Sequence, residues 1–282
     1  MKQSHELKTA IETAIGAGKV LNRYYKKLQK SQIASKKSEG LVSKADLESE
    51  KFIKKSLMKE FKDFKFLGEE GAFKNKREYN KFKKEFPQYE NCWVVDPLDG
   101  TTNFIYGLDY FCVCIGLVKK GVPSLGVVYR PTTGEVYFAE KGKGAYKLDT
   151  TKKSVRPKKL KVTTFSKDLR NTLLVTGFAA EKGGNEDKEF KLFKGLLKKS
   201  RGVRRLGSAA IDICFVADGI FGAFWERGLA PWDICAAGVV LQEAGGVVSS
   251  FDGEDFDAFQ STTLATTKIH HKKLMRAINQ YK

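Results

Sequence analysis

Histidine and long apolar runs are scarce in this chain of 282 residues. The three histidines, His5, His270 and His271, lie outside every motif described below, which argues against a histidine nucleophile or a histidine-bound zinc. The sequence contains neither a Ser-His-Asp arrangement nor a P-loop. No stretch approaches the roughly 20 apolar residues of a membrane span, and the first residues lack the apolar run of a signal peptide. We therefore expect a cytoplasmic protein that does not enter a membrane.

Cysteine is also sparse, and its distribution argues against zinc fingers and a disulfide framework. The cysteines are odd in number, mostly lie in apolar segments and lack zinc-finger spacing: Cys92, Cys112, Cys114, Cys214 and Cys235. Two of them, Cys112 and Cys114, are separated by one residue on an expected strand, which is a common setting for small buried side chains. We expect reduced cysteines with a structural role.

Acidic residues are outnumbered, because 33 Asp and Glu face 51 Lys and Arg and leave a net charge of +18. Such a charge raises the question of a nucleic-acid or acidic partner. The basic residues are spread through the expected helices, with clusters at 74–84, 152–161 and 198–205. We favour a solvated, lysine-rich surface and keep nucleic-acid binding as an alternative.

What the sequence does contain is an acidic motif that follows a short apolar run. Residues 92–95 predict a buried strand, and we expect it to end at Asp96 because Pro97 lacks a backbone donor. Asp99 follows after three residues, so a tight turn can bring both carboxylates together, where they repel each other unless a cation lies between them. Asp, Pro and Gly are also ordinary turn formers, so a solvated turn remains the alternative.

The residues after this turn predict the start of a helix. Gly100, Thr101 and Thr102 would expose backbone N–H groups, and the glycine would allow close approach of a ligand. A helix start of this kind suits a phosphate group. Carboxylates beside a phosphate site require a hard cation, for which Mg²⁺ is the leading choice.

The full string from Trp93 to Phe104 resembles the signature of the inositol monophosphatase family of Mg²⁺-dependent, lithium-sensitive phosphatases. The segment from Trp232 to Gly246 is similar to the second signature of that family, and Gly68-Glu69-Glu70 matches a third motif. The resemblances cover nearly the whole chain in the expected order. They imply a layered α/β/α/β/α sandwich, which we divide into residues 1–155 with the first metal motifs and residues 156–282 completing the active site.

The resemblance also implies a set of metal ligands. Glu69, Asp96 and the carbonyl of Leu98 would hold a first Mg²⁺, whereas Asp96, Asp99 and Asp233 would hold a second. Without the family resemblance, Glu69 and Glu70 could be interpreted as solvated charges, and Asp233 could simply interact with the dipole of the helix that it begins. Only the combination of these carboxylates favours a two-metal centre.

Catalytic and substrate-binding roles follow from the same resemblance. Catalysis would depend on Glu69 and on Thr101 paired with Asp46, which together position the attacking water. Substrate contacts would come from the following residues: Asp99, Gly100, Thr101, Ala209, Glu226, Asp233 and the segment 177–179. Asp46 could instead be a capping residue, because it stands three positions after the expected N-cap Ser43. Ser43 and Gly40 depart from the family pattern, and Ala179 stands where proline is frequent.

The rest of the chain fits this plan. Residues 111–146 predict an antiparallel meander, residues 73–89 predict a lysine-rich helical excursion, and the second half alternates strands with helices. The expected protein is an inositol-1-monophosphatase, active as a homodimer on a small phosphate monoester. Related folds hydrolyse fructose 1,6-bisphosphate, 3′-phosphoadenosine nucleotides, histidinol phosphate or NADP, and an RNA- or transcription-complex-binding role is the alternative from another class.

Overall fold

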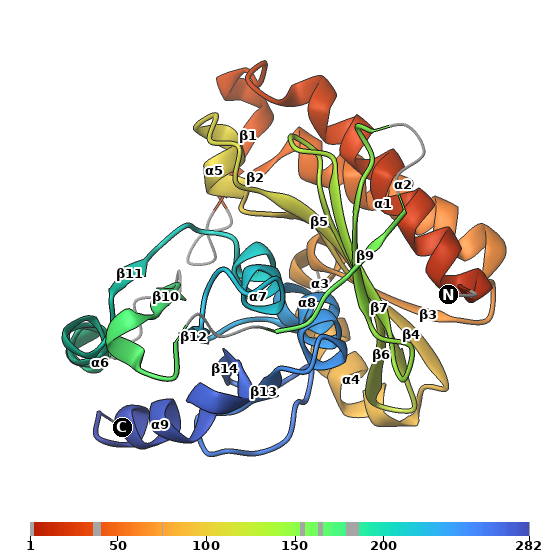
Figure 1. Cartoon of the computed structure of the whole chain (residues 1–282). Helices are drawn as coiled ribbons and strands as arrows, with labels where there is room; N and C mark the ends of the chain where they lie inside the picture. Colours follow the sequence, from red (N-terminus) through yellow and green to blue (C-terminus); the bar gives the residue numbers. More distant parts are fainter. Residues whose placement is uncertain are drawn as a thin grey trace.

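The computed structural model describes residues 3–35, 41–74, 76–152, 156–162, 166–178 and 186–281. In the described residues, helical layers alternate with two large β-sheets (Figure 1). The outer layers are helical, and a third helical layer lies between the sheets. This arrangement confirms the predicted α/β/α/β/α sandwich. The described chain contains no helix that is both long and apolar enough to cross a membrane.

The first outer layer consists of α1 (His5–Tyr24) and α2 (Lys44–Glu60), which pack against each other and against the larger sheet. Ser4 caps α1 by accepting the N–H of Leu7 on its Oγ at 3.1 Å. The spacing of the apolar residues predicts a helix over residues 5–28, but α1 ends at Tyr24 in a turn where Lys26 has a positive φ of 59°. Along the chain, the segment between these two helices forms a small sheet of β1 (Ile33–Ser35) and β2 (Leu41–Ser43). Gly40, singled out from the sequence, lies outside the described residues.

The larger sheet has seven strands, all antiparallel to their neighbours except for the parallel pair β3 and β4. In spatial order the strands are β3 (Lys65–Gly68), β4 (Asn91–Asp99), β5 (Cys112–Lys119), β6 (Val122–Arg130), β7 (Glu135–Glu140), β8 (Ala145–Asp149) and β9 (Lys158–Lys159). The predicted meander is therefore confirmed. One face packs on α1 and α2 through a core that includes Trp93, Phe111 and Phe138.

Strand β4 continues past the point where the sequence predicts its end. It pairs with β5 up to Asp96 opposite Cys114, shifts register, and pairs again where Asp99 lies opposite Cys112. The irregularity accommodates Pro97, which cannot donate to the ladder, so the proline bends the strand instead of ending it. As a result both aspartates belong to the same end of the same strand.

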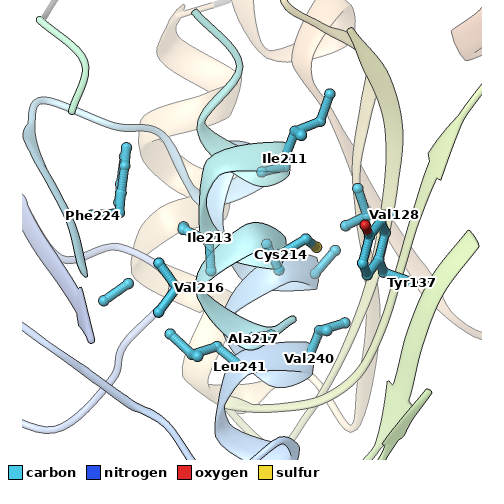
Figure 2. Packing of buried hydrophobic residues seen from close by; sticks show 14 of the residues in the cluster. Val128, Tyr137, Ile211, Ile213, Cys214, Val216, Ala217, Phe224, Val240 and Leu241 are labelled. Carbon is cyan, nitrogen blue, oxygen red and sulfur yellow. The ribbon is translucent and has the colours of Figure 1, made fainter. Parts of the chain in front are cut away.

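The middle layer consists of α7 (Ala209–Ala217) and α8 (Pro231–Glu243), and both helices are almost fully buried. Figure 2 shows side chains of α7 and α8 between Val128 and Tyr137 of the larger sheet and Phe224 of the smaller one. Glycine allows α8 to approach the larger sheet closely, because a Cβ atom at position 126 would lie 2.0 Å from the carbonyl oxygen of Ala236. One core thus joins residues from both halves of the chain, and the division at residue 155 stays a prediction.

The smaller sheet has five strands and is covered on its outer face by α6 (Glu186–Lys199) and α9 (Lys268–Asn279). Its spatial order is β11 (Gly202–Arg204), β10 (Leu173–Thr176), β12 (Ala223–Arg227), β14 (Thr262–Thr266) and β13 (Val247–Ser249). The strands β11 and β14 were absent from the prediction. β14 has a weak apolar signal because three of its five residues are threonine, although its β-branched side chains favour a strand.

Three shorter helices lie near the carboxyl ends of β3 and β4. α4 (Lys76–Glu85) lies within the lysine-rich helical excursion predicted for residues 73–89, α3 (Glu69–Lys74) precedes it, and α5 (Thr101–Ile105) follows the acidic turn. α4 is amphipathic: the ring of Tyr79 lies 5.9 Å from that of Trp232, and Phe82 lies 6.0 Å from Phe86. The contact of Tyr79 with Trp232 holds α4 against the first turn of α8, and the contact of Phe82 with Phe86 packs α4 on the turn that follows it.

Candidate active site

The carboxylate of Asp96 is the most deeply buried of the four carboxylates predicted as metal ligands, with 2% of the residue exposed. Its Oδ1 accepts the backbone N–H of Leu98 at 2.8 Å. Burial raises the pKa of Asp96 well above its ordinary value, and the nearby carboxylates of Glu69, Asp99 and Asp233 raise it further. The fold therefore brings together the four carboxylates that the sequence predicts as metal ligands.

Asp99 differs because hydrogen bonds from α7 hold it in place. Its Oδ2 accepts the hydroxyl of Ser208 at 2.6 Å and the backbone N–H of Ala210 at 2.9 Å. Burial still raises the pKa of Asp99, although these hydrogen bonds act in the opposite direction. From the sequence, the small residues 207–210 indicate only room for a ligand or a close helix contact, so this hydrogen bond was not predicted.

Gly100 turns the chain from β4 into α5 with a φ of 91°, a left-handed conformation that favours glycine. The turn brings Thr101 back toward the strand end, where its Oγ1 lies 3.0 Å from both Asp46 Oδ1 and the carbonyl oxygen of Leu98. A hydroxyl has a single proton, so it can donate to one of these acceptors at a time. In either case the oxygen lone pairs remain able to accept a hydrogen bond.

Asp46 is the capping residue that the sequence allows, and it also contacts Thr101. Its Oδ2 accepts the backbone N–H of Ser43 at 2.8 Å and the Ser43 hydroxyl at 2.6 Å, which forms the predicted capping box at the start of α2. Its other oxygen faces Thr101. The cap thereby fixes the orientation of the carboxylate that contacts Thr101.

The start of α3 places Glu69 at the end of β3, beside the acidic end of β4. The Glu50 carboxylate, on α2, accepts the backbone N–H groups of Glu70 at 2.8 Å and Gly71 at 3.0 Å. Glu50 thus caps α3 from a neighbouring helix and fixes the direction in which Glu69 leaves the strand. This positioning role has no local signal in the sequence, because the two segments are 20 residues apart.

Asp233 lies in the first turn of α8, and its Oδ2 accepts the backbone N–H of Ala230 at 2.7 Å. This contact agrees with the helix-start interpretation of Asp233, and the electrostatic effect on Asp96 shows that the same carboxylate also belongs to the acidic cluster. Burial raises the pKa of Tyr79 on α4, and the nearby carboxylate of Asp233 raises it further.

Glu226 lies near the end of β12 and is 7% exposed. Burial raises its pKa well above the ordinary value, and Asp233 adds to the shift, whereas Arg205 opposes it. Gly177 packs directly on this carboxylate, since a Cβ atom there would lie 1.9 Å from Glu226 Oε2. Ala209 begins α7 near Asp99, and Ala179 lies outside the described residues.

Two further groups near the site escaped the sequence interpretation. Burial raises the pKa values of Glu226 and Asp212 well above the ordinary range, and the positive charge of the exposed Arg205 opposes this rise. Asp212 is buried in α7 and accepts the Tyr110 hydroxyl on Oδ1 at 2.7 Å. The pair Arg204-Arg205 before Gly207 was read as part of a basic surface cluster, so its place beside acidic groups was not recognised.

Comparison with known proteins agrees with this geometry. A model of the inositol monophosphatase family matches residues 2–282. The inositol-1-monophosphatase of Synechocystis sp. is 35% identical over 96% of this chain and 88% of its own length. A Nus factor SuhB of Xylella fastidiosa is 34% identical over 87% of this chain and 82% of its own. The structure of the extragenic suppressor protein SuhB from Bartonella henselae superposes with a TM-score of 0.83 at 30% identity, covering 98% of this chain and 99% of that one.

The fold and the buried carboxylates define a phosphatase of the layered α/β/α/β/α class. The chain belongs to the inositol monophosphatase family, as its motifs predicted.

Proposed function

We propose that this protein hydrolyses small phosphate monoesters with the help of Mg²⁺, and that inositol monophosphate is its first candidate substrate. The observation that carries the proposal is the contact of Thr101 Oγ1 with Asp46 and with the Leu98 carbonyl, 3.0 Å each, at the end of the strand that bears Asp96 and Asp99. A polarised hydroxyl beside converging carboxylates suits water attack on a phosphate ester.

The donor set fits Mg²⁺ because every group predicted to hold it offers oxygen. Glu69, Asp96 and the Leu98 carbonyl would hold one ion, and Asp96, Asp99 and Asp233 a second. Burial and mutual repulsion raise the pKa of Asp96, which supports a cation as the natural partner of this cluster. When bound, Mg²⁺ would neutralise charge on the phosphate and lower the pKa of water.

The protein groups would then orient the reactants. Thr101 donates its proton to Asp46, so the lone pairs of its oxygen accept a hydrogen bond from the attacking water and direct that water toward phosphorus. Ser43 keeps Asp46 in place through two hydrogen bonds to the other carboxylate oxygen. The backbone N–H groups of Gly100 and Thr101 would bind phosphate oxygens.

The alcohol part of the substrate would lie toward the second half of the chain. Glu226 and Asp233 can bind its hydroxyl groups, with Ala209 and Gly177 leaving room for a ring. Glu226 is held in a buried position that only glycine at residue 177 permits, which fixes the carboxylate for recognition. This arrangement favours a polyhydroxylated alcohol such as inositol.

A substrate panel tests the proposal. Purified protein should release phosphate from myo-inositol 1-phosphate in the presence of Mg²⁺ and lose this activity in EDTA. Fructose 1,6-bisphosphate, a 3′-phosphoadenosine nucleotide, histidinol phosphate and NADP should be slower. A higher kcat/KM for one of these four would reassign the substrate. If none of the five compounds released phosphate in a metal-dependent way, the phosphatase proposal would be refuted.

Two further properties belong to this proposal. The second Mg²⁺ would be the looser one, because its remaining ligands would be water and substrate, and Li⁺ could replace it. Li⁺ should therefore inhibit uncompetitively or in mixed mode and less strongly as Mg²⁺ increases. Purely competitive inhibition that does not depend on Mg²⁺ would place Li⁺ elsewhere.

We also propose a cytoplasmic homodimer, which light scattering can test through the molar mass in solution.

A second candidate function is association with RNA, in line with the relatives named Nus factor SuhB. Arg77, Lys81 and Lys84 share one face of α4 and, with Asn80, line an open hollow of about 490 Å³. Such a face can neutralise backbone phosphates. Replacing its three basic residues with glutamine should weaken RNA binding and reduce its salt dependence more than the same change at Lys51, Lys55 and Lys59 of α2. Equal effects would indicate non-specific attraction.

A further inference from the structure

Two thiols lie directly behind Asp99 on the adjacent strand. Cys112 faces Asp99 in the register of β4 and β5, and Cys114 lies two residues further along on the same side of the sheet. The sulfur atoms are 3.6 Å apart, and Cys112 Sγ lies 3.7 Å from Asp99 Oδ2. These three ligand atoms all lie within 4.8 Å of one another, and the described residues hold no other group of three His, Cys, Asp or Glu side chains this close.

The spacing matches the coordination geometry of zinc. With Zn–S bonds of about 2.3 Å and Zn–O bonds of about 2.0–2.2 Å, a tetrahedral site places two sulfur ligands about 3.7 Å apart and a sulfur and an oxygen about 3.5 Å apart. The observed separations of 3.6 Å and 3.7 Å agree with both values. The hydroxyl of Ser208 lies 3.6 Å from Cys112 Sγ and 2.6 Å from Asp99 Oδ2, which puts a fourth polar atom, an oxygen, beside the other three.

We propose that Asp99, Cys112 and Cys114 form a binding site for a soft divalent cation such as Zn²⁺ or Cd²⁺. Thiolates select soft metals, whereas Mg²⁺ prefers carboxylate and water oxygen, so one carboxylate is shared between two kinds of site. Both thiols release their protons as the metal binds. Because Asp99 is more exposed than the two buried thiols, the cation enters past this carboxylate.

Sharing of Asp99 has a functional consequence that rests on the proposed Mg²⁺-dependent activity. A cation bound to the two sulfurs draws the Asp99 carboxylate away from the second Mg²⁺. Zn²⁺ at this site therefore inhibits phosphate release, and a higher Mg²⁺ concentration opposes the inhibition.

Binding can be tested without an activity assay. Co²⁺ bound by thiolate gives a sulfur-to-metal charge-transfer band in the near ultraviolet, so titration of the reduced protein with Co²⁺ reports thiolate coordination directly. Wild-type protein should show the band and lose it when Zn²⁺ is added. Cys112→Ser and Cys114→Ser should each abolish the band, whereas Cys92→Ser, which changes a buried thiol on the neighbouring strand, should keep it.

The affinity and the inhibition complete the test. Loss of one thiolate should weaken Zn²⁺ binding by more than the roughly tenfold to hundredfold that loss of an outer-shell partner costs, measured by competition with a chromogenic chelator. The Zn²⁺ concentration for half-inhibition should increase in parallel, but not in Cys92→Ser.

Several outcomes would overturn the site. These are absence of the Co²⁺ band from the wild type, its persistence in both serine variants, or unchanged Zn²⁺ affinity in them. Thermal melting of each variant, with Cys114→Ala as a second replacement, excludes misfolding as the cause of a lost band. An intact band in a protein without phosphatase activity would refute the proposed function and leave the metal site standing.

Discussion

The two halves of the molecule differ in how they surround the two aspartates at the end of β4. The first half supplies Asp96 at a strand end, where its carboxylate accepts one N–H from the same strand and where burial and other carboxylates raise its pKa. The second half supplies donors, because Ser208 and Ala210 of the α7 region hold Asp99. Repulsion is thus concentrated at Asp96, whereas Asp99 is stabilised by contacts that only the folded pair of halves provides.

Replacing Asp96 with asparagine should have the largest effect on activity. The amide would remove a negative charge proposed to contact both ions, so kcat/KM should fall by at least about 10³-fold in a phosphate-release assay. The fold should survive, because asparagine relieves repulsion at a buried position. Melting in EDTA checks this second point, and full activity in Asp96→Asn would exclude the metal assignment.

The same variant gives a pH-dependent prediction. The pKa of Asp96 is higher in the folded than in the unfolded protein, so the folded state binds the proton more tightly. Below the ordinary aspartate pKa the group is protonated in both states, and wild type and Asp96→Asn should melt alike. As pH increases from there, the metal-free wild type should lose stability relative to the variant until the folded pKa is passed. A difference that is constant with pH would contradict this origin.

Thr101→Ala should have the next largest effect. The loss of an interaction made mainly in the transition state should lower kcat by about 10²-fold and leave KM nearly unchanged. Thr101→Ser keeps the hydroxyl and should recover most of the rate, and Thr102→Ala, on the exposed side of the same short helix, should behave like wild type. A large increase in KM with kcat intact would instead make Thr101 a phosphate-binding residue.

The extent to which the site could be predicted depends on sequence distance. Asp46, Asp96 and Thr101 stand in motifs with local signals, and the layered fold was implied by the family resemblance that these motifs carry. Glu50 and Ser208 act across 20 and 109 residues, so no local pattern reveals their partners. Pro97 was misread for a related reason: proline ends many strands, but pairing with β5 on both sides of the irregularity carries β4 past it.

Ser208→Ala tests the contribution of the second half to Asp99. Without the hydrogen bond at 2.6 Å, the carboxylate keeps the Ala210 N–H and becomes less well oriented. Apparent Mg²⁺ affinity should fall by about tenfold, as for other residues that orient metal ligands. The Mg²⁺ dependence of kcat/KM measures the effect, with Ser124→Ala on an exposed contact of β6 as the control. Equal Mg²⁺ dependence in both variants would show that Ser208 does not position Asp99.

The smallest effect on activity is expected for Tyr110→Phe, which separates folding from catalysis in the second half of the site. The variant removes the hydroxyl that lies 2.7 Å from Asp212 and leaves a buried carboxylate oxygen without this donor. The free energy of unfolding should fall by about 1–3 kcal/mol, the typical cost of an unsatisfied buried acceptor. The aromatic ring remains, so Arg130, 5.7 Å from its centre, keeps its contact. Urea denaturation measures the loss, and Tyr106→Phe, at a residue that is 77% exposed, should show none. A purely structural contact leaves the rate of the folded protein unchanged. A lower kcat measured where the variant is fully folded would therefore mean that Asp212 acts on the substrate.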